Sequence, residues 1–359
     1  MAQVSGVAIR GISTAVPKNV SRVADYAQFS AEEAERFSKS TGIRERRIVG
    51  GSGEIPQCAS DLCAFAADDL LGKLAWERAD VGALIMITQT GDHPVPATAI
   101  LLQHRLGLPQ TCISFDVNLG CSSFPYGLMI VGSLMQTAGI KRALLLIGDV
   151  SSKVCNIEDK SSWPLFGDAG SATALELDDS AAPMHFDLMT DGRGAQAIII
   201  PGGGPASRLP VSAENLAPVP DKNGMPRHAA NLQLRGADIF SFAISKVPPS
   251  ITRALAAAQW VPESADRIVL HQANKMINDT IRKKLGAPEE VFPASLEKFG
   301  NTSSVSVPLT MCHTRADWTF PCRAVFAGFG VGLSWGAATA VLQEGTVLSW
   351  VETDDVYPA

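Results

Sequence analysis

Apolar residues follow two alternating patterns along most of the chain. Short apolar runs and two-residue alternation predict strands, and apolar residues at three- and four-residue spacing between them predict helices. In the first half the predicted strands are Val4–Ile12, Ala83–Thr90, Ser114–Asn118, Arg142–Asp149 and Ser171–Leu177. The predicted helices of that half are Ser60–Leu74, Thr98–Leu106 and Ser122–Thr137. Strands that alternate with helices in this way are typical of an α/β fold.

The regular pattern stops at residues 179–235 and then resumes. Prolines and glycines crowd this stretch, which predicts a loop-rich connection rather than an extra domain. After it, the elements predicted are helix Gly236–Ala257, strand Arg267–Leu270, helix Asn274–Leu285, a helix after Ser303, and strands Arg323–Gly328 and Trp335–Gln343. We therefore divide the chain into 1–178, 179–235 and 236–359, with the outer segments as two similar halves.

Composition narrows the class of protein. The chain has 359 residues, of which 46% are hydrophobic and 18% charged, and this argues against disorder. A net charge of −6 opposes a nucleic-acid partner. No apolar run of about 18 residues and no leader pattern occurs, so we expect a cytoplasmic protein without a membrane segment. The seven cysteines lack metal-ligand spacing, which predicts free thiols and no bound metal.

Cys121 lies where a predicted strand passes into a helix that is apolar all round. Such a helix is buried. A thiol at its N-terminus would face unpaired N–H groups and the positive end of the helix dipole, and both favour the thiolate. The sequence therefore predicts that Cys121 is an activated nucleophile.

Two more junctions carry chemically useful side chains. His271 follows strand Arg267–Leu270, and Asn301 lies on a turn before another helix. A neutral imidazole and an amide can both donate hydrogen bonds to a developing enolate oxygen, whereas a carboxylate would repel it. Each residue alone has a simpler explanation, as a core cysteine, a core histidine and a turn asparagine. The combination favours a thiol enzyme that transfers acyl groups.

The combined pattern resembles β-ketoacyl-acyl-carrier-protein synthase III and the wider thiolase-fold condensing enzymes. The matching stretches are Thr41-Gly42-Ile43-Arg44, Phe115-Asp116-Val117 before Cys121, Phe166-Gly167-Asp168-Ala169-Gly170, Asn231 to Gly236, His271-Gln272-Ala273-Asn274, Gly300-Asn301-Thr302-Ser303 and Gly328-Phe329-Gly330-Val331-Gly332. The resemblance implies a five-layered αβαβα fold of two duplicated halves and a homodimer that pairs the N-terminal halves. It also implies acyl thioesters of coenzyme A or acyl carrier protein as substrates, with no metal or redox cofactor.

Residue by residue, the resemblance assigns roles in a decarboxylative condensation. Cys121 would be acylated, and His271 and Asn301 would promote decarboxylation of a malonyl thioester to give a 3-oxoacyl product. The backbone N–H groups of Cys121 and Val331 would form the oxyanion hole, with Val331 at a position where the family has glycine. That role requires Val331 to avoid a positive φ.

The substrate contacts implied by the resemblance are Phe166, Asn274, Lys275, Phe37 and Val95. The family's Trp and Arg that hold the coenzyme A adenine are missing near Arg36 and Ser40, which leaves Phe37 as the nearby aromatic residue, and Lys275 precedes Met276 where an Arg is usual. Val95 replaces a Phe that the dimer partner inserts into the acyl pocket, so we expect acyl chains longer than acetyl.

The basic run Arg282-Lys283-Lys284 is the predicted docking site for an acidic carrier protein. A solvated last helical turn, with charges that complement the helix dipole, explains the same run equally well.

Three other functions remain open from the sequence. An acyltransferase of the same fold would move the acyl group to a hydroxyl or amine without condensation, although it would not need Asn301. A papain-like cysteine hydrolase has Cys, His and Asn in the same chain order but lacks the Cys-Gly-Ser-Cys-Trp signature here. A silent subunit of a heterodimeric enzyme would show a damaged triad, which this chain does not.

Overall fold

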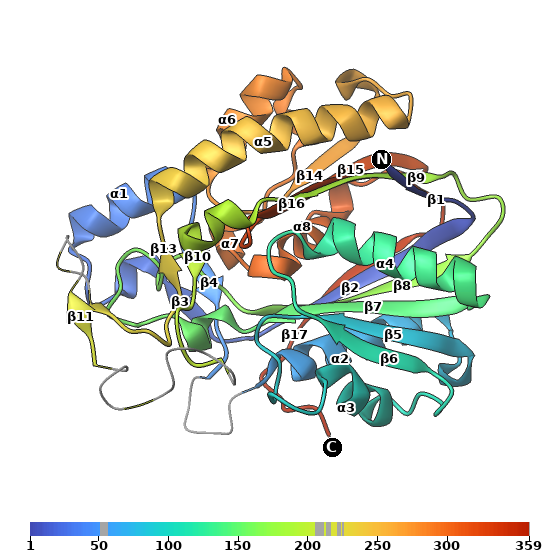
Figure 1. The fold of residues 1–359 in the computed structure, drawn as a ribbon, viewed down its shortest axis with the longest axis horizontal. Helices are drawn as coiled ribbons and strands as arrows, with labels where there is room; N and C mark the ends of the chain where they lie inside the picture. The colour runs from blue at the N-terminus through green and yellow to red at the C-terminus, as the bar shows by residue number, and fades with distance from the viewer. Residues whose placement is uncertain (51–56, 205–211, 213–216, 221–223, 225, 359) are drawn as a thin grey trace.

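Two mixed β-sheets form the centre of the protein, and helices cover and separate them (Figure 1). The computed structural model describes residues 1–50, 57–204, 212, 217–220, 224 and 226–358. The first sheet has the order β17 (Val347–Glu352), β2 (Val7–Val16), β8 (Ala169–Leu177), β7 (Arg142–Asp149), β5 (Val81–Ile87) and β6 (Ile113–Val117). The second has the order β1 (Ala2–Val4), β9 (Met184–Thr190), β16 (Ser334–Leu342), β15 (Cys322–Gly330) and β14 (Arg267–Leu270).

Helices complete five layers. The outer layer on the first sheet is α2 (Ala59–Leu74) and α3 (Thr98–Arg105), and the outer layer on the second is α5 (Gly236–Ala257) and α6 (Lys275–Leu285) (Figure 1). Between the sheets lie α4 (Ser123–Ala138) and α8 (Ser306–His313), each of which contacts both sheets. The αβαβα architecture predicted above is confirmed.

The two sheets repeat one pairing scheme. In the first, β5 is parallel to β7, β7 is antiparallel to β8, and β8 is antiparallel to β2. In the second, β14 is parallel to β15, β15 is antiparallel to β16, and β16 is antiparallel to β9. The same sequence of parallel and antiparallel neighbours in both sheets supports a duplicated unit.

The edge strands depart from the predicted division into halves. β1, at the start of the chain, pairs with β9 in the second sheet, and β17, near its end, pairs with β2 in the first. The predicted single strand Val4–Ile12 is therefore wrong, because Gly6 turns the chain with a φ of 65° between β1 and β2. The stretch 179–235 also contains a true sheet strand, β9, and part of that stretch lies outside the described residues.

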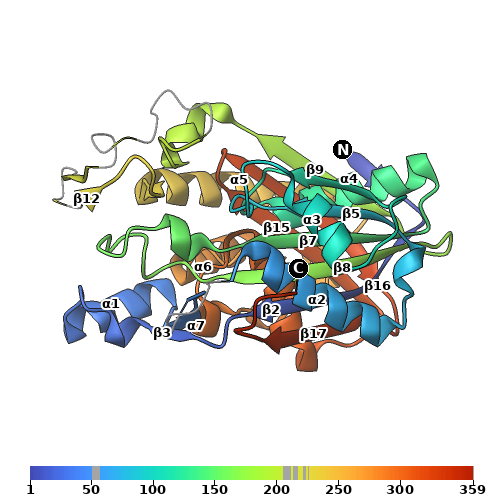
Figure 2. The same cartoon turned by 90° about the horizontal axis from the view of Figure 1, so that it is seen from below.

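Helix α1 (Ala31–Thr41) is not among the elements predicted above. Ser30 and Glu33 form a capping box at its start, and Gly42 ends it in the left-handed conformation with a φ of 80°. Figures 1 and 2 place α1 and the short strand β3 (Val20–Arg22) towards one end of the molecule and the N-terminus in the opposite half. Beside them, β4 (Glu45–Arg47) pairs with β3, and the short helix α7 spans Leu296–Phe299. The remaining short strands are β10 (Ile198–Ile199), β11 (Val219–Pro220), β12 (Pro226–Arg227) and β13 (Gln233–Leu234).

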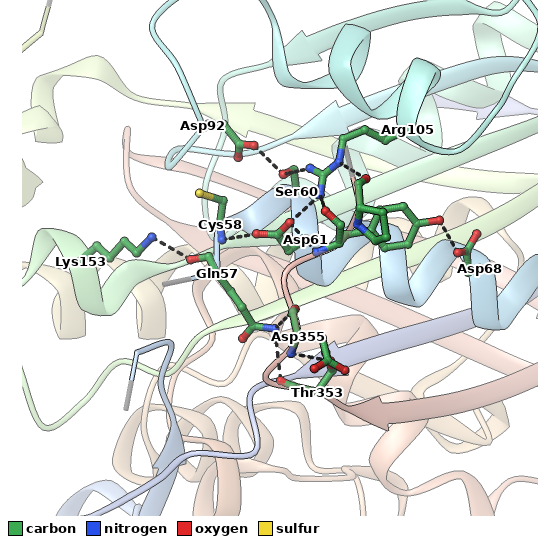
Figure 3. Close-up of polar contacts among 12 residues, drawn as sticks. Gln57, Cys58, Ser60, Asp61, Asp68, Asp92, Arg105, Lys153, Thr353 and Asp355 are labelled. Carbon is green, nitrogen blue, oxygen red and sulfur yellow. Dashed lines mark hydrogen bonds and ion pairs between the residues drawn. The ribbon is translucent and has the colours of Figure 1, made fainter. Parts of the chain in front are cut away.

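The C-terminal tail is fastened to α2 and α3 by polar contacts (Figure 3). Arg105 on α3 donates hydrogen bonds to the Asp61 carboxylate at 2.6 Å, to the Ser60 hydroxyl at 2.7 Å and to the carbonyl of Tyr357 at 2.7 Å. Gln57 donates to the carbonyl of Asp355 at 2.8 Å. We call this group of contacts the C-terminal clasp.

Within the described residues, none of the helices is both long enough and apolar enough to cross a lipid bilayer.

Candidate active site

A cavity of about 580 Å³ opens between the two halves and contains all three predicted reactive residues in its wall. Cys121 comes from the first half, and His271 and Asn301 come from the second. Much of the remaining wall is apolar and comprises Val154, Leu165, Phe166, Ile198, Ile199, Ile200, Leu232, Leu234, Ile239, Ile277, Phe329 and Val331. The fold therefore brings together side chains that are 150 and 30 positions apart along the chain.

Glycines allow the chain to pack closely around Cys121, which lies between β6 and α4. A Cβ atom at Gly330, the last residue of β15, would lie 2.6 Å from the Cys121 sulfur. At Gly328 it would lie 2.7 Å from the Cys121 carbonyl oxygen, and at Gly120 it would lie 2.4 Å from the Gln89 side chain. The distances at Gly328 and Gly330 are too short for a side chain, so β15 can approach Cys121 this closely only because glycine occupies these two positions.

The backbone N–H groups of Val331 and of Cys121 itself act on the Cys121 sulfur, and both lower the pKa of the thiol. The condition set on Val331 is met, since its φ is not positive and the following residue, Gly332, has the φ of 135°. Both donors predicted for an oxyanion hole therefore lie at the nucleophile.

His271 directly follows β14, and its backbone N–H donates to the carbonyl of Ala327 at 2.7 Å. Its Nδ1 atom lies 2.6 Å from the Ser306 hydroxyl oxygen, and the Phe329 ring packs against the imidazole at a centroid distance of 5.3 Å. Burial lowers the pKa of His271 to about 3, and a hydrogen bond with the Ser303 backbone offsets only part of that effect. The imidazole is therefore neutral at physiological pH.

Asn301 is fixed at both its backbone and its side chain. Its N–H donates to the Leu165 carbonyl at 2.9 Å, and its carbonyl accepts from Gly167 at 3.0 Å. The side-chain oxygen accepts the N–H of Ser303 at 2.9 Å, whereas the amide nitrogen has only a 3.5 Å contact to the carbonyl of Ala273. Within the described residues, this assignment leaves at least one of the two amide N–H groups able to donate to a ligand.

Two family models match this chain. One, described as 3-oxoacyl-[acyl-carrier-protein] synthase III, covers residues 115–192, and the other, its C-terminal part, covers residues 255–342. A β-ketoacyl-[acyl-carrier-protein] synthase III of Clostridium perfringens is 31% identical over 91% of this chain and 97% of that protein. One from Desulfitobacterium hafniense is 33% identical over 92% and 96% of the two chains. The chain belongs to the 3-oxoacyl-[acyl-carrier-protein] synthase III family.

A solved structure agrees with this assignment for the whole fold. The 3-oxoacyl-(acyl-carrier protein) synthase of Burkholderia xenovorans LB400 superposes with a TM-score of 0.89 at 33% identity, covering 98% of both chains. This synthase III is therefore a condensing enzyme of the transferase class with the thiolase fold.

The resting thiol of this synthase III differs from the prediction. Although Cys121 keeps some accessible surface towards the cavity, burial raises the pKa of its thiol to about 11. Hydrogen bonds from Val331 N–H and from the Ser303 side chain lower that pKa, and the negative charge of Asp149 raises it further. Desolvation therefore outweighs the donors at the start of α4 that were expected to favour the thiolate. Cys121 must lose a proton before or during its acylation.

The predicted substrate contacts separate into two groups. Phe166 and Asn274 line the cavity. The Asn274 side-chain oxygen caps α6 by accepting the N–H of Ile277 at 2.9 Å.

Phe37 and Lys275 lie outside the cavity wall. The Phe37 ring packs against Phe29 at 5.3 Å, and the Lys275 ammonium pairs with Asp279 on α6 at 2.7 Å. Roles for both in binding the outer part of a substrate stay predictions.

Val95 and the basic run lie at the surface. Val95 is 82% exposed in the single chain. In the basic run, Arg282 pairs with Glu289 at 3.3 Å, Lys284 donates to the Ile244 carbonyl at 3.0 Å, and Lys283 is exposed. Two of the three cations of this run are thus already engaged within the chain.

Sequence reasoning missed several polar residues in and behind the cavity wall, among them Asp149, Ser303 and Ser306. Asp149 and Ser303 are part of the cavity wall, and the Ser306 hydroxyl contacts Nδ1 of His271 from outside that wall. Asp149 is the last residue of the buried strand β7. Polar residues at strand ends often bind ligands or take part in catalysis in α/β folds, so the position of Asp149 in the sequence could have identified it.

Among the described residues, His, Cys, Asp and Glu do not gather in a group of three that could hold a metal ion.

Proposed function

We propose that Cys121 accepts the acyl group of an acyl thioester and that this group then condenses with a carbanion formed by decarboxylation of a malonyl thioester. The observation that carries this proposal is the shared cavity, where Cys121, His271 and Asn301 meet with the N–H of Val331 at the sulfur. The product is a 3-oxoacyl thioester, as the name of the family indicates.

Acylation requires charge stabilisation on the thioester oxygen. When the Cys121 sulfur attacks the carbonyl carbon, the oxygen becomes negative, and the N–H groups of Cys121 and Val331 donate to it. Fixed donors of this kind in a site shielded from water lower the barrier because they need no reorganisation. The leaving thiolate then takes a proton and departs.

Decarboxylation needs donors rather than a base. With the Ser306 hydroxyl donating to Nδ1 of His271, the Nε2 atom carries the ring proton and donates to the malonyl thioester oxygen. The free N–H of Asn301 supplies a second hydrogen bond to the same oxygen. As carbon dioxide leaves, the carbonyl oxygen gains the enolate charge, and the carbanion attacks the acyl carbon bound to Cys121. The carbon–sulfur bond then breaks, the 3-oxoacyl product is released, and the Cys121 thiolate takes up a proton from water. A neutral His271 fits this role, because its N–H can donate a hydrogen bond while the ring carries no positive charge.

The apolar wall indicates the substrate class. An acyl chain would lie against side chains such as Ile198, Leu234 and Phe329. Phe166 and Asn274 would contact the acyl thioester nearer the sulfur. The small Val95 of a second copy would leave more room in the pocket than a Phe, so we propose acyl chains longer than acetyl. The donor would be an acyl-CoA or acyl carrier protein thioester, with Phe37, Lys275 and the run Arg282, Lys283 and Lys284 as the proposed outer contacts.

A homodimer would be built through the open edge of the first sheet. β6 is the last strand of that sheet, and within the described residues no strand pairs with its outer side. Ile113, Phe115, Ile100 and Val95, on or near this edge, are all exposed in the single chain. An exposed apolar edge strand is a template for pairing with a second chain.

The chemistry proposed for this enzyme needs no metal or redox cofactor, because every step uses thiol, amide, imidazole or backbone groups.

The decisive experiment is intact-protein mass spectrometry after incubation with a panel of acyl-CoA and acyl-carrier-protein donors. The wild type should gain the acyl mass, and Cys121→Ala should not. Cys58→Ala is the matched control because Cys58 is the other cysteine that is not buried. Carbon dioxide release from a malonyl thioester then separates condensation from simple acyl transfer. If Cys121→Ala is acylated like the wild type, the assignment of the nucleophile is refuted.

A further inference from the structure

Two buried serine hydroxyls link the start of α4 to the turn between β15 and β16. Ser122 directly follows Cys121, Ser334 is the first residue of β16, and their hydroxyl oxygens lie 2.6 Å apart. The Ser334 hydroxyl also donates to the Val331 carbonyl at 2.9 Å. Because a hydroxyl has one proton, Ser122 donates to Ser334, and Ser334 donates to Val331. We call this directed chain of two hydrogen bonds the serine link.

Ser122 does not perform the usual task of a serine at its position. It is the N-cap residue of α4, where a serine hydroxyl normally accepts an N–H of the first helical turn. Here the hydroxyl makes no cap hydrogen bond, and the backbone, with a φ of −94° and a ψ of 6°, is not extended as at an ordinary N-cap. A buried hydroxyl needs a partner, and Ser334 provides it. Ser122 therefore contacts the turn instead of capping its own helix.

The turn that receives this contact is part of the cavity wall beside Cys121. Gly330, Val331 and Gly332 all line the cavity. Gly330 pairs with Ser334 across the ladder of β15 and β16, which fixes the chain on one side of Val331. The hydrogen bond from Ser334 to the Val331 carbonyl fixes the chain on the other side. The peptide groups on both sides of Val331 are thus restrained, and with them the direction of its N–H.

β15 and the turn after it pack directly on the start of α4. A Cβ atom at Gly328 would lie 2.7 Å from the Cα atom of Ser122. A Cβ atom at Gly120, just before Cys121, would lie 2.5 Å from a methyl carbon of Val331, so the Val331 side chain lies against this glycine. In such a close-packed contact, a hydrogen bond between the two elements determines how they sit relative to each other. The serine link is such a bond.

We propose that Ser122 and Ser334 are positioning residues for acylation, and that the serine link holds the N–H of Val331 where the thioester oxygen becomes negative. Ser122 is the chain neighbour of the nucleophile, so the same link fixes Cys121 relative to this second donor. Neither serine is part of the cavity wall, so both act through Val331 and not on the substrate. Donors stabilise a developing charge only when they are held in place beforehand. This inference rests on the proposed function, in which Cys121 is the nucleophile.

The test compares two reactions of Cys121 by mass spectrometry. Acylation, by a thioester donor that acylates the wild type, forms a negative oxygen, whereas alkylation by iodoacetamide displaces iodide and forms none. Both reactions use the same thiolate, so the ratio of their rates cancels changes in thiol acidity. This ratio should fall by about 10- to 100-fold in Ser122→Ala and in Ser334→Ala. Both variants should fold, because two backbone hydrogen bonds between Leu333 and Asp191 hold the same turn.

Ser123→Ala is the matched control. Ser123 is buried at the same helix start, but its hydroxyl donates to backbone carbonyls that precede Cys121 and not to the turn, so its variant should keep the wild-type ratio. Since Ser334→Ala already breaks the whole link, adding Ser122→Ala should lower the ratio no further. An unchanged ratio in both single variants, an equal fall in Ser123→Ala, or additive losses in the double variant would overturn the positioning role. Acylation of Cys121→Ala would instead overturn the proposed function.

Discussion

The Nδ1 atom of His271 lies 2.6 Å from the hydroxyl oxygen of Ser306, the first residue of α8, and both residues are buried. A backbone hydrogen bond from His271 to β15 fixes one side of the residue, and Ser306 fixes the ring. The contact with Ser306 therefore restricts the orientation of the imidazole. The role proposed for His271 in decarboxylation would depend on Ser306, which is not part of the cavity wall.

Ser306→Ala should impair decarboxylation much more than acylation. Without the hydroxyl, Nδ1 is left without its partner, and the ring can change tautomer and tilt, which should lower carbon dioxide release by about 10- to 100-fold. Acylation of Cys121 should stay near the wild-type rate, as measured by mass spectrometry. Ser295→Ala is the control, since that buried hydroxyl bonds Thr310 on α8 rather than His271. Equal losses in both steps would contradict a positioning role for Ser306.

Gly330→Ala should block acylation. The new methyl carbon would lie 2.6 Å from the Cys121 sulfur, so either the thiol or β15 must move. We expect a fall of at least about 100-fold in the acylation rate, because small displacements of reacting groups are costly. The control is Gly72→Ala on α2, where no atom lies within 4 Å of the added carbon. The control should keep full activity, and wild-type acylation by Gly330→Ala would show that the close contact is unimportant.

His271 should make the protein less stable in acid. The folded-state pKa is lowered to about 3, below the unfolded value near 6.5, so in this range the unfolded chain binds the proton and the folded protein does not. The free energy of unfolding should therefore decrease as pH falls through this window, by up to about 1.4 kcal/mol per pH unit from this group. Stability is retained above the window.

This contribution can be isolated by comparing urea unfolding of the wild type and His271→Asn near pH 7 and near pH 5. Asp149 and Asp168 act in the opposite direction, since burial raises the pKa of both carboxyl groups and favours the folded state in acid. Both proteins share these carboxyl groups, so the difference between the two pH dependences belongs to His271. The same loss in both proteins would refute the prediction.

Arg105→Ala should destabilise the fold through the C-terminal clasp (Figure 3). The variant leaves the Asp61 carboxylate buried without its cation and frees the carbonyl of Tyr357, so we expect a loss of about 3 kcal/mol in the free energy of unfolding. Arg193→Ala is the control, since its ion pair with Asp191 is on the surface and should contribute less than about 1 kcal/mol. Urea denaturation measures both, and equal effects would argue against the clasp.

Substitutions at β6 should separate the proposed homodimer. Ile113→Lys and Phe115→Lys each place a charge on the exposed edge of the first sheet and should reduce the mass measured by light scattering to that of one chain. Val261→Lys is the control at another exposed apolar residue, away from this edge. A wild type that is already monomeric at working concentration would contradict the proposed assembly.

The sequence by itself determined many of the local elements and indicated the three residues that share the cavity. The bounds of helix Gly236–Ala257 and strand Arg267–Leu270 match the structure, because apolar spacing reflects contacts that repeat every few residues. Cys121, His271 and Asn301 were found because each follows or precedes such an element. The glycines at positions 328 and 330 were also visible in the sequence. The structure explains them, because a side chain at either position would collide with Cys121.

Only the tertiary structure decided the protonation of Cys121, the partners of Asp149 and Ser303, and the exchange of β1 and β17 between the sheets. Desolvation depends on everything that surrounds a group, so the helix dipole alone gave the wrong charge for the thiol. Lys275 likewise pairs with Asp279 instead of facing the cavity. Strand pairing and cavity walls join residues far apart along the chain, and a local pattern carries no information about such distances.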